Sequence, residues 1–363
     1  MTESETIAAR DGDAIDADVL RRWISFELPS TVPESATVSI RQFPAGFSNL
    51  TYLVEVQRGA ESHSMVLRRP PRGGRSGLAH DVAREYRILR ALHPLGMPVP
   101  EPVALCDDEH VIGAPFYLMQ HVKGTILRAK PPDWLVAERD VCERTMRSLS
   151  SSFVSALAGL HAVDVSTEPL RSLGRAGGYV ERQVQGWTRR WHASRTEHVP
   201  DIETLAAWLD ANRPADQAPA LVHNDFKYDN LVLDESLSSI RAILDWEMAT
   251  KGDPLMDLGT SLAYWVEAGD APAFRSLGLG ATALPGNATR AEVVQQYHEL
   301  TGRDVSRAPF YYAFGLFKVA VIAQQIYARH VQGMTSDPRF ARLGDIVRAL
   351  GEAGARASQA DRL

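Results

Sequence analysis

The stretch LVHNDFKYDN, residues 221–230, places a histidine, two aspartates, a lysine and an asparagine within ten positions. A second acidic run, AILDWEMATKGDPLMDLG, follows at residues 242–259. Between them, NLVLD and SIRAILDW flank the turn residues ESLS, which predicts a hairpin that returns Asp245 toward Asn230. Asp225 precedes the first strand of that hairpin. These three oxygen-bearing side chains are therefore expected to act together.

Their chemistry suits phosphoryl transfer. Asn230 and Asp245 offer the hard oxygen ligands that Mg²⁺ prefers alongside water and substrate phosphates. Asp225, in the loop that leads into the strand, is placed to accept a proton. Phosphoryl transfer needs a positioned nucleophile and metal-bridged phosphate oxygens, and little covalent chemistry from the protein. Taken singly, Asp225 and Asn230 could instead cap turns, so the whole ordered set carries the prediction.

Upstream of this stretch, residues 35–122 have the pattern of a small sheet with one helix. Strands are predicted in ATVSIRQFPAGFSNLTYLVEVQ (36–57), SMVLRR (64–69), PVALC (102–106) and APFYLMQHV (114–122), and a helical stripe in AHDVAREYRILRALH (79–93). From Lys123 onward the pattern is mostly helical. Helices are predicted near residues 145–162, 178–195, 202–211, 255–267, 290–301, 308–332 and 339–355.

The bulk composition excludes several classes of protein. The 363 residues are 45% hydrophobic, and the net charge of −6 gives no general attraction to nucleic acid or to an anionic membrane. With only Cys106 and Cys142, neither a disulfide framework nor a four-cysteine zinc site can form. We expect a soluble, cytoplasmic protein with no membrane partner. The sequence indicates no oligomeric state.

The motifs resemble those of a known superfamily. H-x-D-x-x-x-x-N at residues 223–230, followed by an aspartate after a hairpin, resembles the catalytic loop and metal-binding aspartate of the protein-kinase-like fold. LDWE and GDPLMDLG are similar to the aminoglycoside phosphotransferase and choline kinase superfamily. GFSNLTY, VLRRPP, REYRILRAL, GAPFYLMQHVKG and LHAVD resemble the branch fused to acyl-CoA dehydrogenases and its free-standing bacterial relatives. The resemblance covers about residues 35–335.

It implies an α+β, two-lobed, protein-kinase-like fold with a small antiparallel sheet lobe, one key helix, and a larger mainly helical lobe. We expect a disordered tail over residues 1–18, a nucleotide-binding lobe over 19–122, and a catalytic and acceptor-binding lobe over 123–363. The implied activity is the transfer of the γ-phosphate of ATP, with Mg²⁺, to a small-molecule hydroxyl.

The resemblance also implies roles in the second lobe. Asp225 would be the catalytic base, or would orient the acceptor hydroxyl, and Asn230 and Asp245 would hold Mg²⁺. Lys227 could neutralise charge on the transferring phosphoryl group; alternatively, it is an exposed loop lysine. His223 and Asp257 would be structural supports of the loop.

In the first lobe, the turn residues Gly46, Phe47, Ser48 and Asn49 would lie over the phosphates, where glycine lets the backbone approach closely. The backbone of Gln120 to Val122 would contact adenine, with Met119 packing before it; for Met119, plain core packing is the alternative.

Arg68 stands where related kinases place a phosphate-binding lysine. Glu85, on the following helix, would be its ion-pair partner. An arginine keeps the charge but differs from lysine in reach and geometry. Arg69 cannot replace it, because alternation along the strand sends Arg69 to the opposite face.

The charge of the acceptor half argues against an aminoglycoside. Residues 258–363 hold nine acids and eleven bases, whereas a polycationic substrate calls for an acidic site. Residues 181–195 and 310–330 mix aromatic with basic residues, which suits an anionic or partly apolar acceptor, and the branch suggests a hydroxyacyl thioester or another hydroxylated metabolite. Amphipathic helices with solvated arginines are the alternative explanation.

Two other functions compete with a kinase. Arg68 favours a nucleotide-binding pseudokinase with a regulatory role, whereas the retained Asp225, Asn230 and Asp245 favour turnover. A metal-dependent hydrolase is the second alternative, but it leaves the glycine turn and the Arg68–Glu85 pair without a purpose.

Overall fold

The structure is a computed structural model, and it describes residues 6–10, 12–29, 32–33, 35–44, 49–71, 81–128, 130–175, 177–275, 281–335 and 337–363. The chain divides into two compact units. The first contains residues 1–126, 232–235 and 241–248, and the second contains residues 127–231, 236–240 and 249–363.

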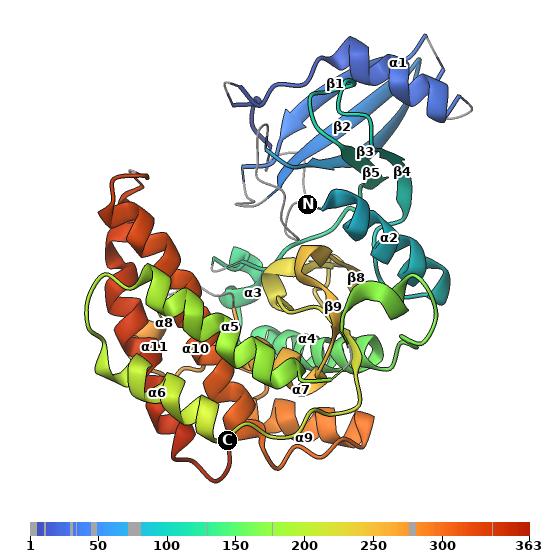
Figure 1. The fold of residues 1–363 in the computed structure, drawn as a ribbon. Coiled ribbons are helices and arrows are strands. Elements are labelled where there is room, and N and C mark those ends of the chain that lie inside the picture. Colours follow the sequence, from blue (N-terminus) through green and yellow to red (C-terminus); the bar gives the residue numbers. More distant parts are fainter. Residues whose placement is uncertain are drawn as a thin grey trace. The chain divides into compact units, whose positions relative to one another are not determined.

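The first unit is built on a five-stranded antiparallel sheet in the order β1-β2-β3-β5-β4 (Figure 1). Its strands are β1 (Thr37–Gln42), β2 (Leu50–Arg58), β3 (Glu61–Arg69), β4 (Pro102–Cys106) and β5 (Phe116–Gln120). The register pairs Thr51 with Arg68 and Arg68 with Tyr117, which fixes Arg68 in the middle of the sheet.

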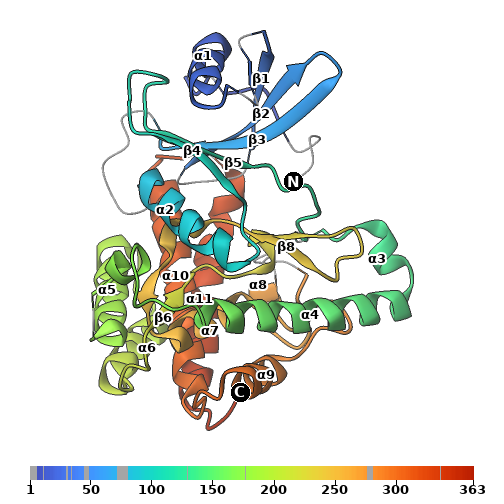
Figure 2. The same cartoon turned by 90° about the vertical axis from the view of Figure 1, so that its right-hand side faces the viewer.

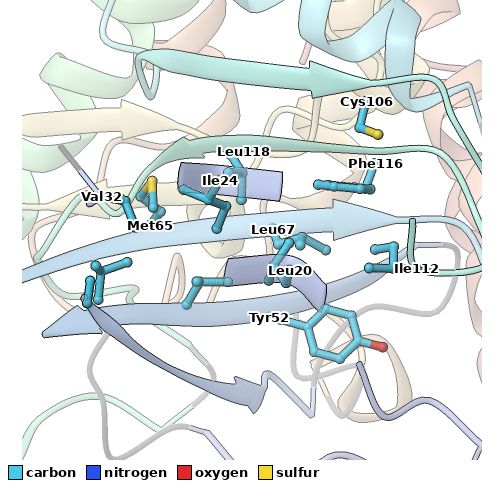
Figure 3. Packing of buried hydrophobic residues seen from close by; sticks show 13 residues of the cluster. Leu20, Ile24, Val32, Tyr52, Met65, Leu67, Cys106, Ile112, Phe116 and Leu118 are labelled. Atoms are coloured by element: carbon cyan, nitrogen blue, oxygen red, sulfur yellow. The ribbon is translucent and has the colours of Figure 1, made fainter. Parts of the chain in front are cut away.

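One face of this sheet packs against α1 (Ala17–Glu27). Leu20 and Ile24 of the helix meet the alternate strand residues Tyr52, Leu67 and Leu118 in one hydrophobic cluster (Figure 3). Because side chains alternate along a strand, Arg68 is directed away from this cluster. It meets α2 (Val82–Leu92), the helix that the sequence predicts after β3.

A short hairpin completes this unit. β7 (Leu231–Leu233) and β8 (Ile240–Ile243) form a two-stranded sheet, as the sequence predicts. Thr125 exchanges backbone hydrogen bonds with Leu233, and the Ile243 amide donates to the carbonyl of Pro98 at 2.7 Å. The 3-10 turn η6 (Trp246–Met248) follows, and it begins directly after Asp245. The hairpin therefore places Asp245 in the same unit as Arg68.

The segment expected to be a disordered tail is anchored from Thr6 onward. The Ile7 backbone bridges to Gln42 at the edge of the sheet. Arg69, fully buried, donates to the carbonyl of Asp13 at 2.9 Å and to the hydroxyl of Tyr52 at 2.9 Å. A buried guanidinium needs such acceptors, and the tail supplies one of them. Arg69 thus lies on the face opposite to Arg68, as expected from strand alternation.

The second unit is mainly helical (Figure 2). Its helices are α3 (Asp133–Ala137), α4 (Arg139–His161), α5 (Tyr179–Ser194), α6 (Pro200–Ala211), α7 (Pro254–Tyr264), α8 (Pro272–Arg275), α9 (Arg290–Thr301), α10 (Ala308–Val331) and α11 (Leu343–Ser358). Three further 3-10 turns are η4 (Leu170–Leu173), η5 (Tyr228–Asn230) and η7 (Pro338–Arg342), and η3 (His93–Leu95) belongs to the first unit. The strands β6 (Ala220–Val222) and β9 (Thr250–Gly252) pair antiparallel.

Helix α10 is the centre of this unit, since α5, α6, α7 and α11 all pack against it. Its contact with α7 is made by two glycines. A Cβ added at Gly315 would lie 2.1 Å from the carbonyl oxygen of Gly259, and one added at Gly259 would lie 2.1 Å from that of Tyr311. The two backbones therefore touch, and no larger residue fits between them.

The predicted fold class is confirmed: a small antiparallel sheet with one key helix is followed by a larger helical part. The sequence missed the short elements α3, α8, β6 and β9, whose three to five residues show no periodicity. Among the described residues, no helix combines the length and apolarity needed to cross a membrane.

Candidate active site

The loop that contains Asp225 connects β6 to the turn η5, and buried aromatic side chains anchor it to the core. Phe226 and Tyr228, both buried, stack around the ring of Phe153 with centroid distances of 4.6 Å and 5.4 Å. The Tyr228 hydroxyl donates to Asn287 Oδ1 at 2.9 Å. The alternation of apolar and polar residues in NDFKYDN therefore sends its rings into the core and leaves Asp225 and Lys227 half-buried.

The carboxylate of Asp225 is held on both oxygens. Lys227 Nζ lies 2.9 Å from Oδ1 and 2.8 Å from Oδ2, and Asn230 Nδ2 donates to Oδ2 at 2.9 Å. Burial raises the pKa of Asp225, but the charge and hydrogen bond of Lys227, together with the nearby His223 and Lys318, lower it below its ordinary value. Asp225 is thus an ionised hydrogen-bond acceptor, suited to orienting a hydroxyl.

Asp257, fully buried on α7, holds the backbone just before Asp225. Its Oδ2 accepts from the His223 amide at 2.6 Å, and its Oδ1 accepts from the Asn224 amide at 2.7 Å. His161 Nε2 lies 3.2 Å from Oδ2. Burial raises the pKa of Asp257, but the hydrogen bond from His161 and the neighbouring imidazoles lower it below the usual range. Both residues predicted as supports, His223 and Asp257, are therefore found in one hydrogen-bonded group.

Asn224 has a left-handed backbone, with φ of 66°, which is uncommon outside glycine. Two side chains besides Asp257 hold it there. The Tyr179 hydroxyl donates to Asn224 Oδ1 at 3.1 Å, and Lys318 Nζ, from α10, donates to the Asn224 carbonyl oxygen at 2.7 Å. The turn that aims Asp225 is thus fixed from α5, α7 and α10.

The first unit contains the other half of the predicted residues. Arg68 Nη1 lies 2.7 Å from Glu85 Oε1, so the predicted ion pair is present. Arg68 Nη2 lies 3.1 Å from Asp245 Oδ1 and 3.5 Å from Glu247 Oε2. The Trp246 amide donates to Glu85 Oε1 at 3.2 Å. One guanidinium therefore joins β3 and α2 to the segment after β8.

Burial of this network shifts the pKa values of its members. Desolvation raises the pKa of Glu85, and Arg68 lowers it only in part. Desolvation alone would lower the pKa of Arg68, but Glu85 and its other anionic neighbours hold it well above its ordinary value. Arg68 is therefore a fixed cation surrounded by carboxylates, where a lysine could bond only as a point charge.

The remaining predicted nucleotide-binding residues are only partly described. Gly46, Phe47 and Ser48 lie outside the described residues. Asn49 is buried, and its Nδ2 donates to Glu247 Oε2 at 3.1 Å. Met119 is buried in β5, Gln120 ends that strand and is exposed, and Val122 is half-buried.

Asn230 and Asp245, the predicted magnesium ligands, carry oxygen atoms of the type that Mg²⁺ prefers. Among the described residues, no group of three or more histidine, cysteine or acidic side chains could hold a metal by itself. Mg²⁺ in phosphoryl-transfer sites commonly takes only one or two protein carboxylates and completes its shell with phosphates and water. Asn230 directs its amide nitrogen to Asp225, so its oxygen is turned elsewhere. Asp245 has a left-handed backbone, with φ of 68°. An amide oxygen and a carboxylate suit Mg²⁺.

Two residues of these networks, Glu247 and Tyr179, were missed from the sequence, and so was the contact of Lys318 with Asn224. Glu247 could have been predicted, because it follows Asp245 by two positions in LDWE. Tyr179 and Lys318 were not, since they lie 45 and 94 positions from Asn224. Local spacing carries no information about such contacts.

Together these features define a protein-kinase-like phosphotransferase fold. The model of the "Phosphotransferase enzyme family" matches residues 39–298, and the chain belongs to that family. Among curated proteins, acyl-CoA dehydrogenase family member 11 of Gallus gallus is 34% identical over 367 residues, covering 98% of this chain and 45% of its own. Acyl-CoA dehydrogenase family member 10 of Mus musculus is 32% identical over 347 residues, covering 93% of this chain and 31% of its own. The chain thus spans less than half the length of these relatives.

Solved structures agree. A candidate aminoglycoside phosphotransferase from Ralstonia eutropha has a TM-score of 0.78 and 29% identity, covering 95% of this chain and 99% of its own. The choline kinase of Cryptosporidium parvum has a TM-score of 0.60 and covers 95% of this chain and 96% of its own. Because its sequence identity is only 10%, it supports the fold alone. The predicted superfamily and its acyl-CoA dehydrogenase-linked branch are confirmed, and the family indicates small-molecule phosphoryl transfer in general.

Proposed function

We propose that this protein transfers the γ-phosphate of ATP to a hydroxyl group of a small molecule. The observation that carries the proposal is the state of Asp225. Its carboxylate is bound by Lys227 and Asn230 and set on a turn that α5, α7 and α10 hold. A carboxylate fixed in this way accepts a hydrogen bond from a hydroxyl and can take its proton as the oxygen attacks phosphorus.

In the proposed reaction, the acceptor oxygen forms a bond to the γ-phosphorus, and the bond between that phosphorus and the bridging oxygen to ADP breaks. The hydroxyl proton passes to Asp225, whose low pKa suits an orienting role with late proton transfer. Lys227 is close enough to Asp225 to place its ammonium beside the transferring group, where charge must be balanced.

Residues 19–122 are proposed to bind the nucleotide, and residues 123–363 to supply catalysis and the acceptor site. Arg68 would contact the α- and β-phosphates, with Glu85 orienting it. Residues 46–49 would cover the phosphates, and the backbone from Gln120 to Val122 would meet adenine. ATP fits the fold: a streptomycin–ATP–APH(2")-IIa complex has a TM-score of 0.56 to this chain at 16% identity.

Asn230 and Asp245 are proposed to hold Mg²⁺. Bound there, Mg²⁺ would neutralise negative charge on the phosphates of ATP. The contribution of the chain is to present one amide oxygen and one carboxylate. Arg68, bonded to Asp245, would hold that carboxylate in place.

The acceptor is proposed to be a hydroxyacyl thioester or another hydroxylated metabolite. The names of the curated relatives refer to acyl-CoA dehydrogenases, and the nearly balanced charge of residues 258–363 does not suit a polycation. An aminoglycoside is therefore the less favoured acceptor. Neither nucleic acid nor membrane is proposed as a partner.

A regulatory pseudokinase is the second candidate. It is favoured by Arg68, which replaces the usual lysine and bonds to both Glu85 and Asp245. The two functions separate in one assay, namely ADP release from Mg·ATP with amino alcohols, sugars, aminoglycosides and hydroxyacyl-CoA esters. Acceptor-dependent release that Asp225→Asn abolishes supports the kinase. ATP binding by calorimetry without release for any acceptor supports the pseudokinase.

A further inference from the structure

Lys318 is a buried lysine with no anionic partner in contact. It lies in the middle of α10 and is 3% exposed. Within the part of the chain that the structure describes, no carboxylate lies within salt-bridge distance of its Nζ. A buried ammonium without a paired charge is strongly disfavoured. A leucine or methionine at this helical position would fill similar space without that cost, so the charge calls for an explanation.

The described hydrogen bond of Lys318 goes to the catalytic loop. Nζ donates to the carbonyl oxygen of Asn224 at 2.7 Å, one residue before Asp225. The amide of Asn224 is taken by Asp257 and its side chain by Tyr179. The backbone amide, the side-chain oxygen and the carbonyl oxygen of this left-handed residue are therefore all hydrogen-bonded, and Lys318 is the donor to the carbonyl.

Charged groups near Lys318 lie on the loop, on α7 and on α5. Asp225, Lys227 and His223 lie on the loop, Asp257 lies on α7, and Arg190 lies on α5. The centroid of the Trp187 ring lies 5.7 Å from Lys318 Nζ. The same ring centroid lies 4.7 Å from Arg190 Cζ. Burial lowers the pKa of Lys318 to about 8, although Asp225 and Asp257 act to raise it.

We propose that Lys318 is a positioning residue for phosphoryl transfer: its ammonium fixes the Asn224 carbonyl and thereby the direction of Asp225. The proposal rests on the function proposed above. A charged donor bonds to a carbonyl about twice as strongly as a neutral one, and a neutral amine is also free to turn its lone pair toward the oxygen. Small displacements of a group that orients a reactant cause large losses of rate.

The test compares Lys318→Met, Lys318→Arg and Gln324→Met. Gln324 is a matched control, because it is also buried on α10 and also donates to a backbone carbonyl, that of Ser194 at 2.9 Å, away from the loop. Three quantities are measured for each: Mg·ATP affinity by calorimetry, turnover as ADP release, and hydrogen exchange of the peptide containing residues 222–226. ATP hydrolysis by water serves where no acceptor is found.

Lys318→Met should reduce turnover between about tenfold and about 10²-fold, leave ATP affinity within about threefold, and speed exchange at residues 222–226. Gln324→Met should change neither turnover nor loop exchange. The wild type should lose turnover as the pH rises through about 8, because its ammonium becomes neutral there. Lys318→Arg should not show this loss, because arginine stays charged.

Unchanged turnover and loop exchange in Lys318→Met would overturn the proposal, as would an identical alkaline decline in the wild type and Lys318→Arg. If the wild type shows no turnover at all, the proposed function fails. Loop exchange then decides the role of Lys318 alone: faster exchange in Lys318→Met, but not in Gln324→Met, supports it, and equal exchange refutes it.

Discussion

The glycine contact between α7 and α10 determines where the loop supports lie. Asp257 is two residues before Gly259 on α7, and Lys318 is three residues after Gly315 on α10. Since the two glycines touch through their backbones, the separation of the helices sets the positions of both side chains. We therefore predict that Gly315→Ala damages the loop without altering any residue in it.

The size of the effect follows from the clash. The new Cβ would lie 2.1 Å from the Gly259 carbonyl oxygen and 3.0 Å from the Ala263 Cβ, so the helices must separate by about 1 Å to restore ordinary contact. Overpacking of this kind costs about 1–3 kcal/mol or more, because the obstacle is backbone. The better helix propensity of alanine offsets about 1 kcal/mol. We expect a net loss of about 1–2 kcal/mol and a melting temperature lower by roughly 2–8 °C.

The assay combines thermal unfolding with turnover at a temperature where the variant stays folded. Turnover should fall, because a shift of α10 carries Lys318 away from Asn224. Gly159→Ala is the control: Gly159 lies on the exposed side of α4, a Cβ there meets nothing within 4 Å, and the change should stabilise by up to about 1 kcal/mol. If Gly315→Ala proves as stable and as active as Gly159→Ala, the argument from backbone contact is wrong.

Three further variants test the networks. Asp257→Ala leaves two buried amides without acceptors and should lower the free energy of unfolding by about 3–5 kcal/mol. Because the pKa of Asp257 is low in the folded protein, its contribution to stability is complete above the ordinary pKa and is lost on acidification below it. The free energy of unfolding of the variant should therefore depend less on pH in the acid range than that of the wild type. Lys227→Met should lower kcat by about 10²-fold with little change in KM for ATP, and an equal rise in KM would contradict the assigned role. Arg68→Lys cannot bridge Glu85 and Asp245 with two nitrogens and should lose about 1–2 kcal/mol of stability, which calorimetric melting would reveal.

Much of the site could be predicted because its residues lie close in sequence. Asp225, Lys227 and Asn230 share one loop, and their mutual contacts span two to five positions. The Arg68–Glu85 pair could be predicted from the resemblance, which places Arg68 at the position of a phosphate-binding lysine and Glu85 on the following helix, whereas alternation along β3 only excludes Arg69. The hairpin was predictable from its turn residues.

The rest could not be predicted because it depends on packing between distant segments. The hydrogen bond from Lys318 to Asn224 requires helices α7 and α10 to pack closely. Gly259 and Gly315 make this packing possible, but two glycines in a sequence do not predict it. Similarly, Asp13 accepts from Arg69 only because the N-terminal segment lies along the sheet. The sequence shows Lys318 only as one base in an aromatic helix, a pattern that suits an acceptor site.

The most direct test of the central claim follows the phosphoryl group itself. ATP labelled with ¹⁸O in its γ-phosphate is incubated with the protein, Mg²⁺ and the acceptor panel, and mass spectrometry locates the label. The account predicts that the label appears on an acceptor hydroxyl, and that Asp225→Asn abolishes this product while still binding ATP. Label found only in inorganic phosphate would indicate a hydrolase, and label remaining in bound ATP for every acceptor would indicate a pseudokinase; either result contradicts the account.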